Sequence, residues 1–521
     1  MNFNKKLAVA ISGAVLLMAG QVALADSATD IVDALVSKGI LTEEEGKLIT
    51  KGHTSKTAVT PVVKEKDGAF TLESANGRNS ISLTGRMHLD YRFVDGFENG
   101  RIDDRDSQSL ADQFELRRAR LGVKGKFAND FKYEIVGNLP GTATIDVAFL
   151  DWAKYDKFQI RTGKFKQPFG LEQLTSSNNI ALMERSYVDQ TVPGKKIGLQ
   201  VMGAPKAGFT YALSTFQNHD TELNVSGGGR ASGAARGTIN FAEIMGNKEM
   251  IMHVGLSGLD NSYEVGTSST SQTNNVSDDQ RGTISSFRTP GRGLNNAFRA
   301  QVNGSEACTT AGVSGGCASE FSASVRQQAY GLEGILASGP FKLAGEYSAG
   351  DFKGSQGREN FIGVVNQVKY DVATYYLEAG WFITGEKYAN SYKNGVFSSF
   401  KPNSDFDLDN GKWGAIEALF RFEGYQVDNF SIQQNGVSNA AGGRIQGTQT
   451  GTLATGLESA ARTYTGGIRW ILNPNVVIKA NYSYTRFGNQ FAPIDITADG
   501  GVAANVTNDE KLLSFRTQYM F

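Results

Sequence analysis

Residues 81–93 alternate between apolar and polar side chains with a period of two. The apolar face carries Ile81, Leu83, Met87, Leu89, Tyr91 and Phe93, and the polar face carries Ser82, Thr84, Arg86, His88, Asp90 and Arg92. This period is that of a β-strand, whose successive side chains point to opposite faces. Strands of soluble sandwiches alternate too, but seldom over so long a stretch, whereas a membrane-crossing strand needs about 9–11 residues. The segment therefore predicts a strand that crosses a membrane.

The same pattern recurs along the rest of the chain. Sixteen strands are predicted, at residues 80–95, 114–128, 131–139, 144–155, 158–167, 196–204, 209–217, 235–246, 249–259, 323–337, 341–352, 370–383, 413–428, 462–472, 476–487 and 511–521. An even number of strands is typical of single-chain bacterial barrels. We therefore expect an all-β fold, a 16-stranded antiparallel transmembrane β-barrel over residues 69–521, with long extracellular loops and a short N-terminal helical segment.

The connections between the predicted strands alternate between tight turns and long polar loops, as periplasmic turns and outer loops do in such barrels. Residues 384–412 break this order: either that periplasmic turn is long or the strand prediction beside it is wrong. A barrel of this size leaves a water-filled lumen. Segment 168–195 mixes apolar and polar residues and is expected to fold inward and narrow that lumen.

The N-terminus has the pattern of a signal peptide. Lys5 and Lys6 precede an apolar stretch over residues 7–20, and a small-x-small site ends at Ala25, so residues 1–25 are expected to be removed on export. Residues 26–68 are expected to form a periplasmic helical segment and linker, with Thr42 as a helix cap and Glu45 reaching back to it. This segment is either a plain appendage or an element that trimerises or contacts the cell wall.

Composition excludes several classes of function. Without residues 1–25 the chain has 50 basic and 53 acidic residues, a net charge of −3, so nucleic acid is not an expected partner. The sequence holds four histidines and no paired Ser/His motif, so no catalysis and no cofactor are expected. A structural or adhesive barrel is an alternative class, suggested by the long loop 260–322.

Two further motifs concern disulfides and metals. Cys308 and Cys317 flank a Gly/Ser-rich stretch of a chain expected to be exported, which predicts a disulfide. The run Asp405, Asp407, Asp409, Asn410 and Gly411 resembles a calcium loop only loosely, because Ile416 stands where the last carboxylate is needed. We expect an acidic solvated turn there and no metal.

The C-terminal strand resembles the closing strand of bacterial outer-membrane barrels. Leu512–Phe521 alternates and ends on an aromatic residue, the signal that the barrel-assembly machinery reads in such proteins. Three stretches, LRRARLGVKGKF from Leu116, GKFKQPFGLEQLTSSNNIALMERS from Gly163 and WFITGEKY from Trp381, resemble the phosphate-selective porin O and P family. The resemblance implies a homotrimeric outer-membrane porin, surrounded by lipid and lipopolysaccharide. It also implies one pore per protomer, narrowed by inward loops and lined by an arginine ladder.

The polar faces of the strands supply the candidate pore residues. The cations placed on the lumen side by parity are Arg86, Arg92, Arg118, Arg120, Lys124, Arg161, Arg421, Arg469 and Arg516. Rows of Arg and Lys favour anions through a pore, and Arg516 is expected beside Arg86 or Arg92. Alternatively, these arginines pair with lumen acids and only hold the wall together.

The candidate constriction loop offers hydrogen-bond donors to an anion. It comprises Thr175, Ser176, Ser177, Asn178, Asn179 and Arg185. Residues 171–184 contain no Lys or Arg, where a phosphate-selective pore is expected to add a lysine. The predicted function is passive diffusion of small hydrophilic solutes, anions such as phosphate among them. A general porin without phosphate selectivity is the alternative within this class.

Overall fold

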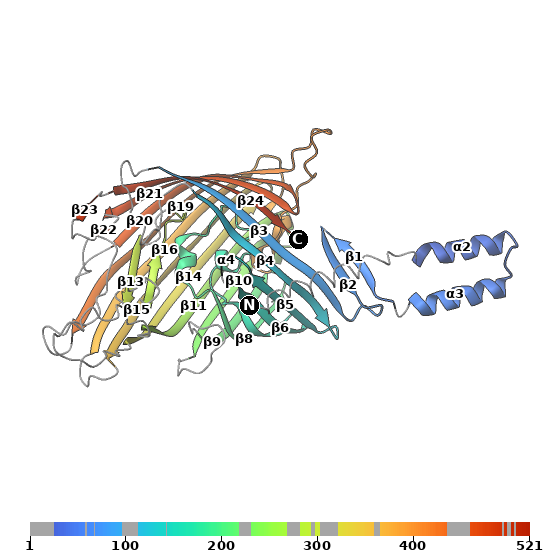
Figure 1. The fold of residues 1–521 in the computed structure, drawn as a ribbon, viewed down its shortest axis with the longest axis horizontal. Coiled ribbons are helices and arrows are strands. Elements are labelled where there is room, and N and C mark those ends of the chain that lie inside the picture. Colours follow the sequence, from blue (N-terminus) through green and yellow to red (C-terminus); the bar gives the residue numbers. More distant parts are fainter. Residues whose placement is uncertain are drawn as a thin grey trace.

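The computed structural model describes all residues except 1–24, 58–59, 67, 96–112, 142, 218–230, 268–281, 293–296, 303–320, 359–364, 435–458, 492–493, 497–501 and 505–506. Sixteen antiparallel strands form one closed barrel (Figure 1). They are β3 Ser80–Asp95, β4 Gln113–Phe127, β5 Phe131–Asn138, β6 Thr144–Tyr155, β7 Phe158–Lys166, β8 Lys195–Lys206, β9 Phe209–Gln217, β10 Ser232–Asn240, β11 Met250–Thr267, β14 Phe321–Ser338, β15 Phe341–Arg358, β16 Val365–Phe382, β19 Ala415–Gln434, β20 Ser459–Asn473, β21 Val476–Phe491 and β24 Thr507–Met520. The predicted number and order of strands are confirmed.

One predicted strand ends early. β10 stops at Asn240, and residues 241–244 form the short helix α6 Phe241–Ile244 where the sequence predicted a strand to 246. Several strands that precede long loops run further than predicted, because their pairing continues beyond the apolar band. Four short strands belong to the loops: β12 Gly282–Phe287, β13 Phe298–Val302, β22 Ile494–Ile496 and β23 Val502–Ala504.

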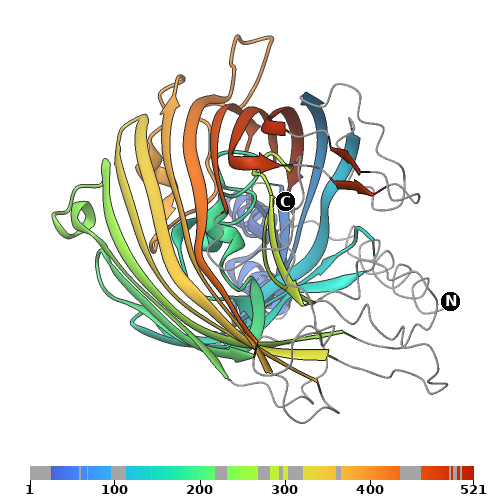
Figure 2. The ribbon, with the colours of Figure 1, turned by 90° about the vertical axis from the view of Figure 1, so that its left-hand side faces the viewer.

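The barrel closes where the C-terminal strand meets the first barrel strand. β24 pairs with β3, with Leu513 opposite Phe93, and the Phe521 N–H donates to the Gly85 carbonyl at 3.2 Å. Figure 2 shows the barrel from one end, with strands around an interior that the chain itself partly fills. Closure satisfies the backbone groups that an open edge would leave unpaired in lipid.

The two faces of β24 show how alternation divides lipid from lumen. Phe515 and Tyr519 are 40% and 44% exposed on the outer face. Arg516 and Gln518, on the other face, are buried inside the barrel. The residue opposite Arg516 is Asp90, not Arg86 or Arg92 as expected, because the register of β24 on β3 places Ser514 opposite Arg92.

The N-terminal segment lies outside the barrel. Two helices, α2 Ala25–Ser37 and α3 Glu43–Thr57, lead to the hairpin of β1 Val62–Lys66 and β2 Ala69–Glu73, and β2 continues the sheet along β3 (Figure 1). The predicted capping box forms: the Thr42 N–H donates to Glu45 Oε2 at 2.9 Å, and the Glu45 N–H donates to Thr42 Oγ1 at 3.2 Å. These bonds lower the pKa of Glu45. Among the described residues, no helix has the length and apolarity needed to span a membrane.

The connection between β16 and β19 is long. It holds a 3-10 helix, η2 Tyr388–Ser391, and a small hairpin of β17 Tyr392–Lys393 and β18 Val396–Phe397. It begins at the short-turn end of the barrel, where the Tyr388 N–H donates to the Gly339 carbonyl at 3.1 Å. Of the two interpretations left open by the sequence, a long turn is therefore the correct one.

Candidate functional site: a lumen narrowed by two inward segments

The segment between β7 and β8 crosses the lumen. It contains two single-turn helices, α4 Leu171–Leu174 and α5 Tyr187–Gln190. Phe169, Leu171 and Tyr187 in this segment are buried, and its bonds reach strands on the far wall. We call residues 167–194 the inward segment.

The first turn of α4 docks on β15 through one carboxylate. Glu346 accepts the N–H groups of Leu171 at 2.8 Å and Glu172 at 2.7 Å, and the Tyr376 hydroxyl donates to it at 2.8 Å. Gly170 precedes the helix at φ +72°, and a Cβ there would lie 2.5 Å from Glu346 Oε2. Only glycine allows both this backbone conformation and this approach.

Arg421 on β19 anchors the same turn from the side. Its guanidinium contacts Glu172 Oε1 at 2.7 Å and Glu378 on β16 at 3.0 Å, and also donates to the Glu184 carbonyl at 3.3 Å. Ser186 donates to Glu172 from both its N–H and its hydroxyl, at 2.7 and 2.6 Å. Burial nevertheless raises the pKa of Glu172, because Arg421 only partly offsets the loss of water.

Glu184 is the second anchor of the inward segment. Arg117 binds it with two hydrogen bonds of 2.9 and 3.1 Å, and Arg516 contacts it at 2.6 Å. Arg516 also binds Asp90 through two hydrogen bonds of 2.6 and 2.7 Å. Burial alone would raise the pKa of Glu184, but Arg117, Arg118 and Arg516 hold it well below its usual value.

Cations also hold the backbone between these two anchors. Lys479 on β21 donates to the Ile180 and Leu182 carbonyls at 2.7 and 3.1 Å. Arg469 on β20 donates to the Asn179 carbonyl at 3.3 Å and pairs with Glu417 at 2.5 Å. Residues 179–184 are therefore fixed to the β19–β24 wall.

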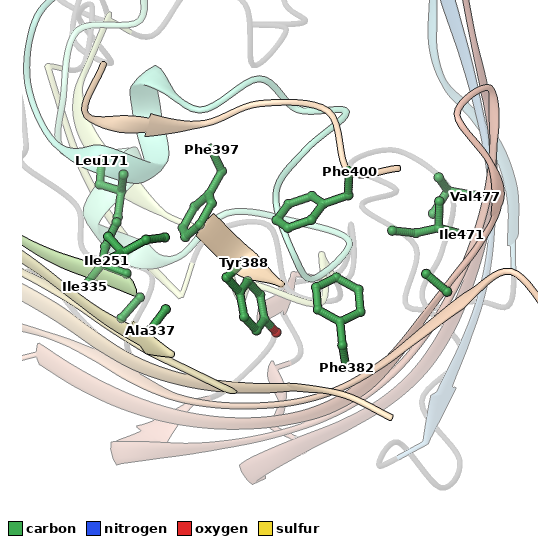
Figure 3. Close-up of a cluster of buried hydrophobic side chains, with 12 residues drawn as sticks. Leu171, Ile251, Ile335, Ala337, Phe382, Tyr388, Phe397, Phe400, Ile471 and Val477 are labelled. Atoms are coloured by element: carbon green, nitrogen blue, oxygen red, sulfur yellow. The ribbon is translucent and has the colours of Figure 1, made fainter. Parts of the chain in front are cut away.

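An aromatic cluster fills the lumen beneath α4. Phe397 and Phe400, from the β16–β19 connection, pack with Tyr388 and Phe382 (Figure 3). Leu171 of the inward segment joins the cluster, and Ile251, Ile335, Ile471 and Val477 contribute to it from the strands. The second inward segment, residues 383–414, thus adds Tyr388, Phe397 and Phe400 to an apolar cluster inside this half of the barrel.

The other half of the lumen contains a cavity of about 1050 Å³. Eleven basic side chains line it: Arg86, Arg118, Arg120, Lys132, Arg161, Lys166, Arg185, Lys195, Lys206, Arg236 and Lys393. Five acidic side chains line it: Glu134, Asp146, Asp156, Asp189 and Glu243. The cavity wall therefore has a clear excess of positive charge.

The constriction-loop residues meet this cavity at one edge. Arg86 donates to the hydroxyls of Ser176 at 3.4 Å and Ser177 at 3.0 Å, while Asn178 Oδ1 lies 3.2 Å from His88 Nε2. The Thr175 carbonyl accepts from Lys166 at 2.9 Å and from Arg185 at 2.8 Å. Lysine and arginine therefore do reach this edge, although residues 171–184 contain neither.

The structure divides the arginines predicted to form one ladder. Those that line the cavity are Arg86, Arg118, Arg120 and Arg161. Those that are buried and ion-paired are Arg92, Arg421, Arg469 and Arg516. Lys124 is exposed near the short-turn end of β4. The alternative interpretation, in which lumen arginines hold the wall together, thus describes the second group. It also describes part of the first, because Arg120 pairs with Asp146 and Arg161 with Asp151.

Several basic residues of the cavity were missed in the sequence. Lys195 pairs with Asp146, and Arg120 contacts the same carboxylate at 2.9 Å. Arg236 pairs with Glu333 and donates to the Gly395 carbonyl at 2.8 Å. The alternation on β10 would have placed Arg236 in the lumen, since Ala235 and Gly237 flank it. Lys393 could not be assigned to the cavity from the sequence, because its position depends on how the β16–β19 connection folds into the lumen.

The cysteine pair and the acidic turn are the two remaining motifs. Cys308 and Cys317 lie outside the described residues. In the acidic turn, Asp407 accepts a hydrogen bond from the Asn410 side chain at 2.5 Å and pairs with Lys412 along the backbone. Within the described part of the chain, no group of three or more potential ligands could hold a metal ion.

Comparison with known proteins shows that the barrel domain is similar to porins. The family described as phosphate-selective porin O and P matches residues 81–521. Porin O of Pseudomonas aeruginosa is 24% identical over 434 residues, which cover 81% of this chain and 86% of that protein. Among solved structures, OmpT of Vibrio cholerae aligns over 85% of this chain and 98% of its own, with 9% identity and a TM-score of 0.43. An anion-selective porin from Comamonas acidovorans aligns over 85% of this chain and 100% of its own, with 10% identity and a TM-score of 0.42.

A closed barrel of sixteen strands with segments folded into its lumen defines an outer-membrane porin, a channel and not an enzyme. The chain belongs to the phosphate-selective porin O and P family.

Proposed function

We propose that the chain forms a water-filled pore through which small hydrophilic anions diffuse passively. The observation that carries the proposal is the cavity wall, with eleven basic and five acidic side chains. Fixed positive charge in a narrow, low-dielectric passage attracts anions and repels cations. The opposite half of the barrel is filled by the aromatic cluster, so the solute path is expected to follow the β3–β10 side.

Phosphate is the solute class that we propose for the edge of the inward segment. Arg86 and the hydroxyls of Ser176 and Ser177 cluster there, close to Lys166 and Arg185. A guanidinium and hydroxyls can together donate several hydrogen bonds to a tetrahedral oxyanion. The description of the family as phosphate-selective porin O and P supports this choice by similarity.

Reversal potentials in planar lipid bilayers test both parts of the proposal. Across a KCl gradient, the reversal potential is expected to lie closer to the equilibrium potential of chloride than to that of potassium. Added phosphate is expected to reduce the chloride current by binding at the edge of the inward segment. Cation preference would refute the anion pore. Anion preference without a phosphate effect would refute phosphate binding and leave a general anion porin.

We further propose that the porin is a homotrimer in lipid and lipopolysaccharide, exported by the signal peptide 1–25 and inserted through its C-terminal strand. Strand β5 has 8 residues and β7 has 9, at or below the roughly 9–11 needed to cross a membrane. Contact with a neighbouring protomer would shield these short strands from the lipid. Mass photometry of the purified protein in detergent would contradict the trimer if it gave only the mass of one chain.

A further inference from the structure

The small hairpin of β17 and β18 lies between the aromatic cluster and the cavity. Phe397 packs in the cluster (Figure 3), whereas Lys393 and Val396 line the cavity. Asn394 and Gly395 form the two-residue turn of the hairpin, with φ of +51° and +79°. An Asn-Gly pair is the preferred sequence for a tight turn of this kind, so the shape of the hairpin is determined locally.

Polar side chains of three barrel strands hold the hairpin against the wall. Arg236 on β10 donates to the Gly395 carbonyl at 2.8 Å. His253 on β11 has its Nδ1 2.7 Å from the Tyr392 hydroxyl and its Nε2 2.7 Å from Glu333 on β14, and Glu333 accepts from Arg236 at 3.0 Å. The side chains of Arg236, His253 and Glu333 are 6%, 0% and 1% exposed. The hairpin therefore cannot leave the wall without leaving buried polar groups unpaired.

Lys393 is the cation that this hairpin carries into the cavity. It is exposed there, and within the described part of the chain its ammonium group has no ion pair. Other cations of the cavity are neutralised by a neighbour: Arg161 pairs with Asp151, and Lys195 with Asp146. The charge of Lys393 therefore acts on a passing ion without a carboxylate beside it.

The short-turn end of the cavity holds as many acids as cations that are free of ion pairs. Among the described residues these are Lys132, Lys206 and Lys393 on one side and Glu134, Asp156 and Glu243 on the other. Of the three cations, Lys132 and Lys206 belong to strands of the wall, whereas Lys393 belongs to a segment inside the barrel. Loss of Lys393 would leave this end of the cavity with an excess of negative charge.

We propose that Lys393 is a selectivity-determining residue at the periplasmic end of the pore, and that the cluster of Arg236, His253, Glu333 and Tyr392 positions it. A cation held at one point of a narrow passage raises the local concentration of anions and lowers that of cations. On a hairpin released from the wall, the same charge would spread over a larger volume and be screened by salt. The proposal rests on the anion path proposed through this cavity.

Charge replacement at Lys393 tests the first part of the proposal, in planar bilayers at low ionic strength. Lys393→Cys is expected to lower the ratio of anion to cation permeability roughly threefold. A cationic methanethiosulfonate reagent is expected to restore the ratio, and an anionic one to lower it further, because each reagent changes the charge at this position. Lys412→Cys is the matched control, since Lys412 is exposed in the same connection but does not line the cavity. Its ratio is expected to stay at the wild-type value before and after both reagents, and treated wild type reports any reaction of Cys308 and Cys317.

Variants of His253 test the positioning role. His253→Phe removes both polar contacts of the ring and is expected to lower the permeability ratio, but to lower it no further in the double variant with Lys393→Gln. His253→Gln keeps an amide that can donate to Glu333 and accept from Tyr392, and it is expected to retain most of the wild-type ratio. Conductance steps show that the barrel of each variant is folded.

The outcomes separate this proposal from the anion pore itself. A wild type that prefers cations would refute the anion pore. An anion-selective wild type whose ratio is unchanged by Lys393→Cys and by both reagents would overturn the role of Lys393 and leave the anion pore intact. Additive effects of His253→Phe and Lys393→Gln would overturn the positioning role, because the two residues would then act independently.

Discussion

Arg421 tests whether ion pairs hold the inward segment across the lumen. Its guanidinium is buried between Glu172 of the inward segment and Glu378 of the wall. We predict that Arg421→Met weakens docking of the segment. Because the segment narrows the pore, its release is expected to produce a second, larger conductance level.

The size of the effect follows from the charges left behind. Removing one partner of a buried ion pair costs about 3–5 kcal/mol, because the other charge stays buried. Lys342 still contacts Glu378 at 2.6 Å in the variant, and Ser186 still donates to Glu172. We therefore take the lower end, about 3 kcal/mol, which changes the ratio of docked to undocked segment roughly 150-fold.

Single-channel recordings are the assay. The wild type is expected to hold one steady level, and Arg421→Met to flicker between that level and a larger one. Arg421→Met/Glu172→Gln removes the stranded carboxylate and is expected to restore most of the steady level, whereas Arg462→Met on the lipid-facing side of β20 is expected to leave it unchanged. A steady wild-type conductance in Arg421→Met, with unchanged thermal unfolding, would refute the reasoning.

Four further predictions concern the pore, its pH dependence, the docking of the inward segment and the N-terminal helical segment. Arg86→Gln removes the cation nearest the serine hydroxyls and is expected to reduce anion preference in reversal-potential measurements and to abolish the phosphate effect; unchanged values would exclude Arg86 from the solute path. The pKa of Glu184 is lowered in the folded protein, so its ionised form stabilises docking above the unfolded value of about 4.3, and that stability is lost only as the pH falls through the lower folded value. Conductance is therefore expected to stay constant from pH 7 down to about pH 4.3; a change of level near pH 6 would contradict this. Gly170→Ala is expected to destabilise docking by about 1–3 kcal/mol, through strain at φ +72° and a clash with Glu346, visible as flicker in the same recordings. Thr42→Ala is expected to destabilise its helix by about 1 kcal/mol, measured by amide hydrogen exchange, with no change in conductance.

The barrel could be predicted because its information is local. The alternation of Phe515, Arg516 and their neighbours reflects two solvents, lipid on one side and water or protein on the other. This constraint acts on each strand separately, so strand number, order and faces can be read along the chain. The pairing of β24 with β3 follows from closure, but the register that places Asp90 opposite Arg516 does not.

The pore depended on contacts between residues far apart in the sequence. Arg86 and Arg421 are both lumen-facing arginines by parity, yet one lines an open cavity and the other is buried against Glu172. What separates them is the path of two inward segments, 167–194 and 383–414, which fill one half of the barrel and leave the other open. Alternation tells which side of a strand a residue faces. Only tertiary packing decides whether that side meets water or another part of the chain, because the partners come from separate strands and loops.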